Sequence, residues 1–187
     1  ATGYDDVSLL DATMTELGIG QGDRLAFYSP RTMNLMAGDL AKRSEATTRS
    51  KTAYEKALVG SDIAGFEVYK NDQVRRLAAA TGGAILINGA NQRTVPAATT
   101  GTGQNEVNKD NRYTDLVVDG GTYANIKAGD AFTLPNVFAL HMISKQNTGQ
   151  LKTFRVIGKP AANTIRVYPA IIDAAEGSAA SIEYANV

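Results

Sequence analysis

The stretch "DAFTLPNVFALHMISKQNTGQLKTFRVIG", residues 130–158, contains two apolar runs with a polar run between them. The first and last parts, 130–143 and 151–158, are rich in aromatic and β-branched residues and predict two strands. The middle part, "SKQNTGQ" at 144–150, has no hydrophobic residue and is rich in residues that favour turns. The stretch therefore predicts a β-hairpin with its connection at 144–150.

Similar short apolar runs on both sides extend this β pattern from about residue 84 to the last residue. Four of the five prolines lie beyond that point, and turn-forming residues separate the runs. Six short strands in such an arrangement are typical of a small barrel or sandwich. Besides the hairpin, the predicted strands are "AILING" (84–89), "YTDLVVDG" (113–120), "TIRVYPAII" (164–172) and "SIEYANV" (181–187).

The first half of the chain has a different pattern, in which helices and strands alternate. In "YDDVSLLDATMTELG" (4–18), apolar residues recur every three or four positions and a glycine follows, which predicts an amphipathic helix. Further along, the sequence predicts a buried strand at 24–29, a helix at 31–43 and a strand at 62–72. The fold class is therefore α+β, with a domain boundary at the change of pattern, between 1–90 and 91–187.

Composition excludes several classes of protein. The 187 residues hold 19 Lys plus Arg and 19 Asp plus Glu, so no basic surplus indicates a nucleic-acid partner. Absence of Cys excludes disulfides, thiolate zinc sites and a thiol nucleophile, and no run approaches the ~20 apolar residues that span a bilayer. The basic residues between Lys42 and Lys51 form either a solvated loop or a phosphate-contacting patch. Because the sequence begins without Met and stops at a strand-like run, we expect a piece of a longer chain.

The search for catalytic, cofactor and metal residues gives none. His141 is the single histidine and lies in an apolar run, where a structural imidazole is the expected role. The glycine-rich segments lack the spacing of a phosphate-binding loop. Glu106 and Asp110 are close in sequence, but the segment lacks the ligand spacing and central glycine of a calcium loop. We therefore predict a protein that is not an enzyme.

The stretch "TTGTGQNEVNKDNR", residues 99–112, is the most polar part of the chain and contains one apolar side chain, Val107. We call this stretch the arm. A loop of this length inside a compact domain is usually either disordered or functional. A flexible linker and a projecting contact segment are the two interpretations.

Taken in order, seven segments resemble the major coat proteins of tailed bacteriophages of the Salmonella podovirus type. No single segment is specific, but their order matches the family over nearly the whole chain. The segments are "GDRLAFYSPRTMNLMAGDL" (22–40), "VGSDIAGFEVYKND" (59–72), "ILINGANQRTVPAA" (85–98), "NEVNKDNRY" (105–113), "KAGDAFTLPNVFALHMISKQNTGQLKTFRVI" (127–157), "IRVYPAII" (165–172) and "YANV" (184–187).

The resemblance implies a capsid subunit with part of a capsid-face domain at 1–90 and a six-stranded antiparallel β-barrel insertion domain at 91–187. It also implies a homo-oligomeric icosahedral shell in the virion, assembled in the host cytoplasm with scaffolding protein, enclosing DNA without reading its sequence and without a membrane. Two family loops would contact neighbouring subunits. On this chain the intersubunit contact candidates are Glu106, Lys109, Asp110 and Arg112 in the arm and Lys145 and Gln146 in the 144–150 loop.

The rival interpretation is a glycan-binding β module of a phage tail fibre or adhesin, because the loops are rich in Thr, Asn and Gly. Sugar sites favour aromatic platforms, and this chain has no Trp and, of its eight Tyr, only Tyr113 beside the arm. A hydrolase would need two carboxylates converging in a cleft, which no spacing in the sequence predicts.

Overall fold

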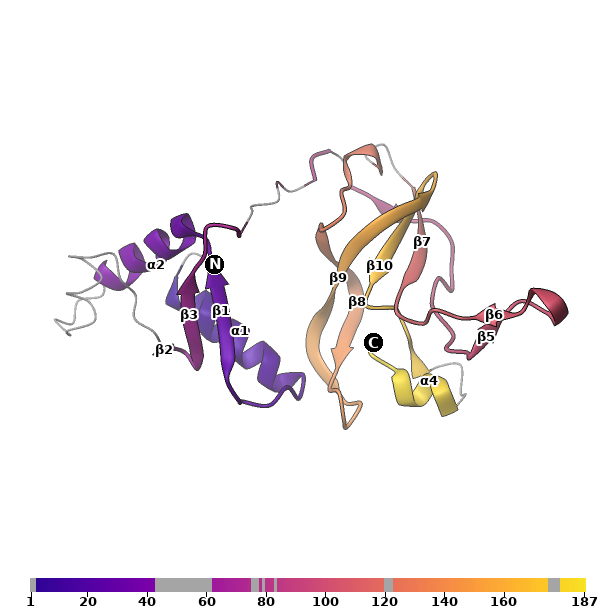
Figure 1. Ribbon diagram of the computed structural model, residues 1–187, viewed down its shortest axis with the longest axis horizontal. Coiled ribbons are helices and arrows are strands. Elements are labelled where there is room, and N and C mark those ends of the chain that lie inside the picture. The colour runs from indigo at the N-terminus through magenta and orange to yellow at the C-terminus, as the bar shows by residue number, and fades with distance from the viewer. Residues whose placement is uncertain are drawn as a thin grey trace. The chain divides into compact units, whose positions relative to one another are not determined.

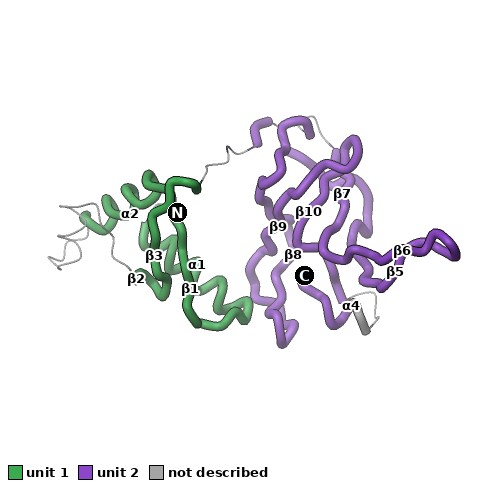
Figure 2. Tube along the Cα trace, viewed as in Figure 1, with its two compact units in different colours: residues 1–76 green, residues 77–187 purple. Residues whose placement is uncertain are grey.

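The structure is a computed structural model that describes residues 3–42, 62–74, 78, 80–82, 84–119, 123–174 and 179–187. The chain divides into two compact units, residues 1–76 and 77–187 (Figure 2). The sequence pattern places the boundary at 90/91, whereas the structure pairs Leu86 and Ile87 with a strand of the second unit. Of the predicted basic cluster, only Lys42 falls among the described residues.

The first unit contains two helices and a small sheet (Figure 1). Strand β3 lies between β1, to which it runs parallel, and β2, with which it forms a tight antiparallel hairpin. The sequence predicts one strand at 62–72, but Ala64 and Gly65 adopt positive φ and turn the chain back. The elements are α1 (Tyr4–Glu16), β1 (Arg24–Tyr28), α2 (Pro30–Lys42), β2 (Asp62–Ile63) and β3 (Phe66–Lys70).

The core of the first unit lies between the helices and one face of this sheet. Met33 and Met36 of α2 are buried as their spacing predicts, and they pack with Val7 of α1 and Phe66 of β3. Helix α2 begins with Pro30. Ser29, the residue before it, caps the helix, because its hydroxyl oxygen accepts a hydrogen bond from the Thr32 amide at 3.3 Å.

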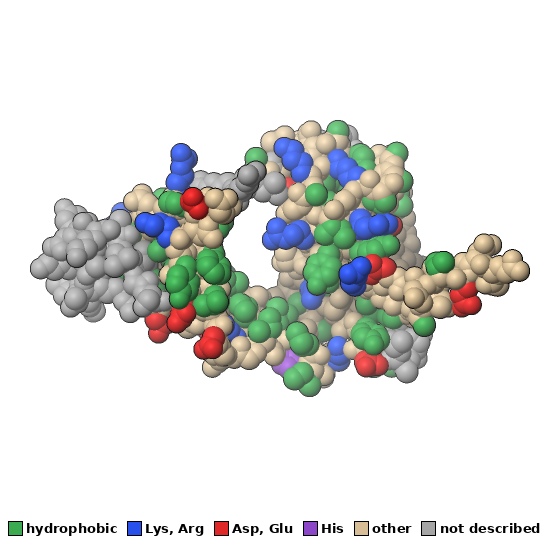
Figure 3. Space-filling view, in the orientation of Figure 1, with side chains coloured by type: hydrophobic (Ala, Val, Ile, Leu, Met, Phe, Trp, Pro, Cys, Tyr) green, Lys and Arg blue, Asp and Glu red, His purple; other side chains and the backbone are tan. Residues whose placement is uncertain are grey.

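On the other face of the first unit's sheet, several large side chains of the described strands are exposed. Leu25 and Phe27 of β1 are 53% and 54% exposed, and the Phe27 ring stacks on Tyr69 with centroids 5.7 Å apart. Hydrophobic side chains gather over β1 and β3 in Figure 3. The sequence predicts a buried strand at 24–29. In the part of the chain that the structure describes, this strand is buried on one face and exposed on the other.

The second unit is built on a five-stranded antiparallel sheet in the order β4-β7-β10-β9-β8, which curls around its core (Figure 1). Its core comes from alternate residues, chiefly Leu116, Val118, Phe154, Val156 and Val167. The sheet strands are β4 (Leu86–Ile87), β7 (Thr114–Asp119), β8 (Ala131–Leu140), β9 (Asn147–Ala161) and β10 (Thr164–Tyr168). The other elements are β5 (Thr99–Thr100), η1 (Gly103–Asn105), β6 (Val107–Asn108), η2 (Tyr123–Asn125) and α4 (Ala179–Tyr184).

The six-stranded barrel that the family resemblance implies is not what the described residues form. The described residues of the second unit form one curled sheet of five strands and the separate β5–β6 pair. The predicted sixth strand at 181–187 instead contains the end of α4. The last residues attach through Asn186, whose side-chain amide donates to Ala170 O at 2.7 Å and whose backbone amide donates to Ile172 O at 2.9 Å. These bonds hold the C-terminal segment on the residues after β10.

Candidate functional site

The arm is a two-stranded ribbon rather than an irregular loop. Strands β5 and β6 pair antiparallel, with Thr99 opposite Asn108 and Thr100 opposite Val107, and η1 lies between them. At Gly101, φ is +94°, and a Cβ would collide with the backbone oxygen of Asn105, so the turn requires glycine. All side chains from 97 to 108 are exposed, and the surface that Figure 3 shows for this ribbon is mainly polar.

Two threonines join the root of the arm to the sheet. The Thr94 hydroxyl donates to Tyr113 O at 3.0 Å and lies 2.6 Å from the Thr114 hydroxyl. Since Thr94 has one proton to donate, Thr114 is the donor between the two hydroxyls. Thr114 Oγ1 also accepts from the Ile171 amide at 2.8 Å. Both threonines are buried, so the chain entering the arm and the chain leaving it are bonded to each other at the sheet.

Further out, side chains join the two legs of the arm, which are the outgoing segment that leaves the sheet after Thr94 and the returning segment that leads back to β7. The Asn111 side chain donates to Ala97 O at 2.8 Å and accepts from the Ala97 amide at 3.2 Å. The Lys109 amide donates to Ala98 O at 3.0 Å, and its ammonium donates to Val95 O. These bonds continue the ribbon from the sheet to β5 and β6.

The four charged contact candidates of the arm all bond within their own subunit. Glu106 accepts from the Thr99 hydroxyl, and Lys109 is engaged as described above. Arg112 binds both oxygens of Asp110, with Nε at 2.9 Å from Oδ1 and Nη2 at 2.6 Å from Oδ2. This hydrogen-bonded guanidinium lowers the pKa of Asp110 to about 2. The structure thus brings Asp110 and Arg112 together and gives Glu106 and Lys109 separate partners.

The other two candidates lie in the β8–β9 turn, residues 141–146, which we call the hairpin tip. The turn is earlier than the predicted 144–150, because β8 ends at Leu140 and β9 begins at Asn147. The Lys145 ammonium donates to Ala185 O at 3.1 Å, and Gln146 O accepts from the His141 amide at 2.8 Å. Nδ1 of His141 accepts from the Ser144 amide at 3.1 Å, so this imidazole has the structural role expected from the sequence.

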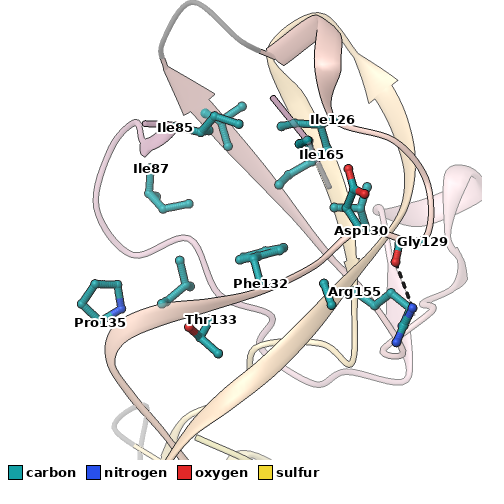
Figure 4. A pocket seen from close by; sticks show the side chains of 15 residues that line it. Ile85, Ile87, Ile126, Gly129, Asp130, Phe132, Thr133, Pro135, Arg155 and Ile165 are labelled. Carbon is teal, nitrogen blue, oxygen red and sulfur yellow. Dashed lines mark hydrogen bonds between the residues drawn. The ribbon is translucent and has the colours of Figure 1, made fainter. Parts of the chain in front are cut away.

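A cavity of about 640 Å³ in the second unit lies on the concave side of its sheet (Figure 4). Its lining is mainly apolar, with Ile85, Ile87, Phe132 and Leu134 among the residues. Arg155 lies at its rim and donates to Gly129 O at 2.9 Å. Within the described ranges, no group of three His, Asp or Glu side chains could hold a metal ion. No helix of the described part is long and apolar enough to cross a membrane.

Comparison with known proteins places the chain in a family. The family model described as "P22 coat protein - gene protein 5" matches residues 1–187. The chain belongs to the P22 coat protein family. A search of curated proteins gave no match. Among solved structures, the CUS-3 coat protein I-domain is similar at 31% identity, covering 53% of this chain and 87% of that chain, with a TM-score of 0.36.

This coat protein is therefore a structural capsid subunit of a tailed bacteriophage, as the resemblance implies. The glycan-binding alternative is not favoured. Its one candidate platform beside the arm, Tyr113, already has the guanidinium of Arg166 over its ring, 3.9 Å from the centroid.

Sequence reasoning about the coat protein missed the cluster of Arg166, Asp115 and Tyr113 at the root of the arm. Arg166 and Asp115 alternate with buried residues, which places each on the outer face of its strand. Opposite charges that face one another across two strands stabilise a sheet, but the sequence does not show that β7 and β10 are neighbours. If the pairing of β7 with β10 were known, the charges of Asp115 and Arg166 would predict this cluster.

Proposed function

We propose that the coat protein builds an icosahedral shell in which the arm of one subunit contacts a subunit of a neighbouring capsomer. The observation that carries this proposal is the arm itself, an exposed polar ribbon bonded at its root to the sheet through Thr94 and Thr114. A ribbon held in this way presents its side chains at a fixed place, which lowers the ordering cost of a contact.

The proposed contact residues are Glu106, Lys109, Asp110 and Arg112 of the arm, with Lys145 and Gln146 of the hairpin tip as a second set. The two bonds from Arg112 to Asp110 use Nε and Nη2, and the Arg112 side chain is 80% exposed, so Nη1 remains accessible to another subunit. Exposed ion pairs contribute about 0–1 kcal/mol each. Contacts of this strength suit a shell of many copies, because misplaced subunits can dissociate.

We further propose that the first unit is part of the capsid-face domain and the second is the insertion domain. The ordered motifs and the change from mixed α and β to β support this division. The sequence pattern favours 1–90 and 91–187 as the two domains, while the pairing of β4 with β7 supports a boundary nearer residue 77.

We further propose where the coat protein assembles and with which partners. Other coat subunits are the main partner, scaffolding protein takes part in assembly, and the shell forms in the host cytoplasm without a membrane. The net charge of zero supports enclosure of DNA without sequence-specific binding. The role is structural and non-enzymatic, with no cofactor.

The test is a charge reversal in the arm, Asp110→Arg, made in the coat protein and followed by particle yield and by the amide spectrum of the unassembled subunit. We expect a lower yield with a folded subunit, since the variant sets two cations side by side at 110 and 112. An unchanged particle yield would show that Asp110 does not form this contact.

A double variant, Asp110→Arg with Arg112→Asp, is the matched control. It restores an ion pair within the arm but reverses the charges offered to a neighbour. If both residues contact another subunit, the double variant also assembles poorly. Normal assembly of the double variant would show that the pair acts within its own arm and would remove both residues from the contact set.

A further inference from the structure

The outer face of the second unit's sheet carries a planar ion pair at the root of the arm. Arg166 of β10 donates from Nε to Asp115 Oδ1 at 2.7 Å and from Nη2 to Asp115 Oδ2 at 2.8 Å. The two residues are register partners on neighbouring antiparallel strands. Two parallel bonds fix the plane of the guanidinium, which a single contact would leave free to rotate.

The same guanidinium covers the aromatic ring of Tyr113. Its central carbon lies 3.9 Å from the ring centroid, in the range where a cation and an aromatic face attract. Tyr113 is the last residue of the returning leg before β7 begins. The ring is therefore held by β10, while the Tyr113 carbonyl is held by the Thr94 hydroxyl of the outgoing leg.

This cluster continues into the arm. One residue beyond Tyr113, Arg112 forms its two bonds to Asp110, and the field of Arg166 also favours the charged form of Asp110. Arg166 is thus bonded to Asp115, stacked on Tyr113 and electrostatically coupled to Asp110. The ion pair of Arg166 with Asp115 joins only two strands of the sheet. The contact of Arg166 with the Tyr113 ring connects the sheet to the segment that forms the arm.

We propose that Arg166 is a positioning residue that clamps Tyr113 and thereby sets the direction in which the arm leaves the sheet. The clamp acts on the subunit before any neighbour binds. Its importance for assembly rests on the proposed function, in which the arm contacts a second copy of this chain.

The direction of the arm can be measured in the isolated chain. Because the protein has no Cys, the variants Gln104→Cys and Thr153→Cys place one spin label on the arm and one on β9 without competing thiols. Pulsed electron paramagnetic resonance then gives the distribution of distances between the labels. We expect a single narrow distribution for the parent chain and a width at least twofold larger for Arg166→Ala.

Two further variants separate the clamp from charge and from folding. Arg166→Lys keeps the charge but loses the planar fork, so we expect an intermediate width. Tyr113→Phe keeps the ring, so the distribution stays narrow, whereas Tyr113→Ala broadens it. If Arg166→Ala does not fold, as judged by its amide spectrum, Tyr113→Ala provides the test of the clamp. An unchanged distribution in a folded Arg166→Ala or Tyr113→Ala variant overturns the proposal.

Particle yield, measured separately, distinguishes this proposal from the proposed function. Broadening together with reduced yield supports both. Broadening with normal yield supports the clamp and counts against the arm as an assembly contact, since a misdirected arm would then have no consequence.

Discussion

At the scale of single residues, the Thr94 and Thr114 hydroxyls form the buried link between the arm and the sheet. In Thr114→Val, the Ile171 amide loses its acceptor and Thr94 loses a donor, without a large change in volume. A buried polar group left unpaired costs about 1–3 kcal/mol. We expect a loss of that size in the free energy of unfolding, measured by urea denaturation of the second unit.

The double variant Thr94→Val with Thr114→Val is the control for this prediction. Because the two hydroxyls bond to each other, the combined loss should be smaller than the two single losses added together. Strict additivity would mean that the hydroxyls do not act as a pair.

The charge of Asp110 gives a pH prediction. Its folded-state pKa of about 2 lies below the ordinary value of 3.8. The pair with Arg112 therefore stabilises the arm root fully above pH 3.8, and that contribution is lost as pH falls through about 2. NMR titration of the Asp110 carboxyl carbon should have its midpoint near 2, and Arg112→Ala should move the midpoint up toward 3.8. A midpoint near 3.8 in the unaltered chain would contradict the pairing.

Sequence reasoning reached the polar arm and its charged residues but not their partners. The composition of 99–112 indicates exposure, and the structure confirms it for 99–108. The bond between Asp110 and Arg112 needs a local backbone turn. The contact of Tyr113 with Arg166 needs β7 and β10 to be neighbours, although Asp115 and Arg166 on these strands are 51 residues apart in the sequence. Charge and spacing do not contain that information.

At the scale of elements, β9 is the longest of the described strands and contributes two fully buried side chains, Phe154 and Val156, to the core. Phe154 is 0% exposed and its ring is 6.0 Å from that of Phe132 on β8. Removing a buried aromatic ring typically costs about 3–5 kcal/mol. We expect Phe154→Ala to lower the free energy of unfolding of the second unit by that amount in chemical denaturation.

Leu151 on the same strand is the comparison, because it is 42% exposed. Leu151→Ala should cost about 1 kcal/mol or less. Equal losses for the two variants would show that the sheet does not bury its core as described.

Sequence patterns predict best the elements that are long, whether apolar residues recur at helical spacing or alternate along a strand. Helix α2 and strands β8, β9 and β10 follow their predicted runs, with ends shifted by a few residues. The run at 181–187 is too short to distinguish alternation from a helical face, and α4 forms there with Ile182 and Tyr184 both exposed. Tertiary bonds from Asn186 decide how that segment is held.

At the scale of the whole molecule, the position of the boundary can be tested with two shorter chains. Strand β4 precedes residue 90 and pairs with β7, with Ile87 opposite Val118. We expect residues 77–187 to fold alone and give a dispersed amide spectrum, and residues 91–187 to be less stable because β7 loses this partner. A collapsed, poorly dispersed spectrum of 77–187 would count against an independent unit.

We propose that the arm of one coat subunit binds another subunit in the assembled shell. Electron cryo-microscopy of particles assembled from the coat protein would show this contact or its absence. If the arm binds a neighbour, density for residues 99–112 lies against a neighbouring subunit, with Arg112 or Glu106 within hydrogen-bonding distance of a polar group there. A well-resolved shell in which the arm contacts only its own subunit would contradict it.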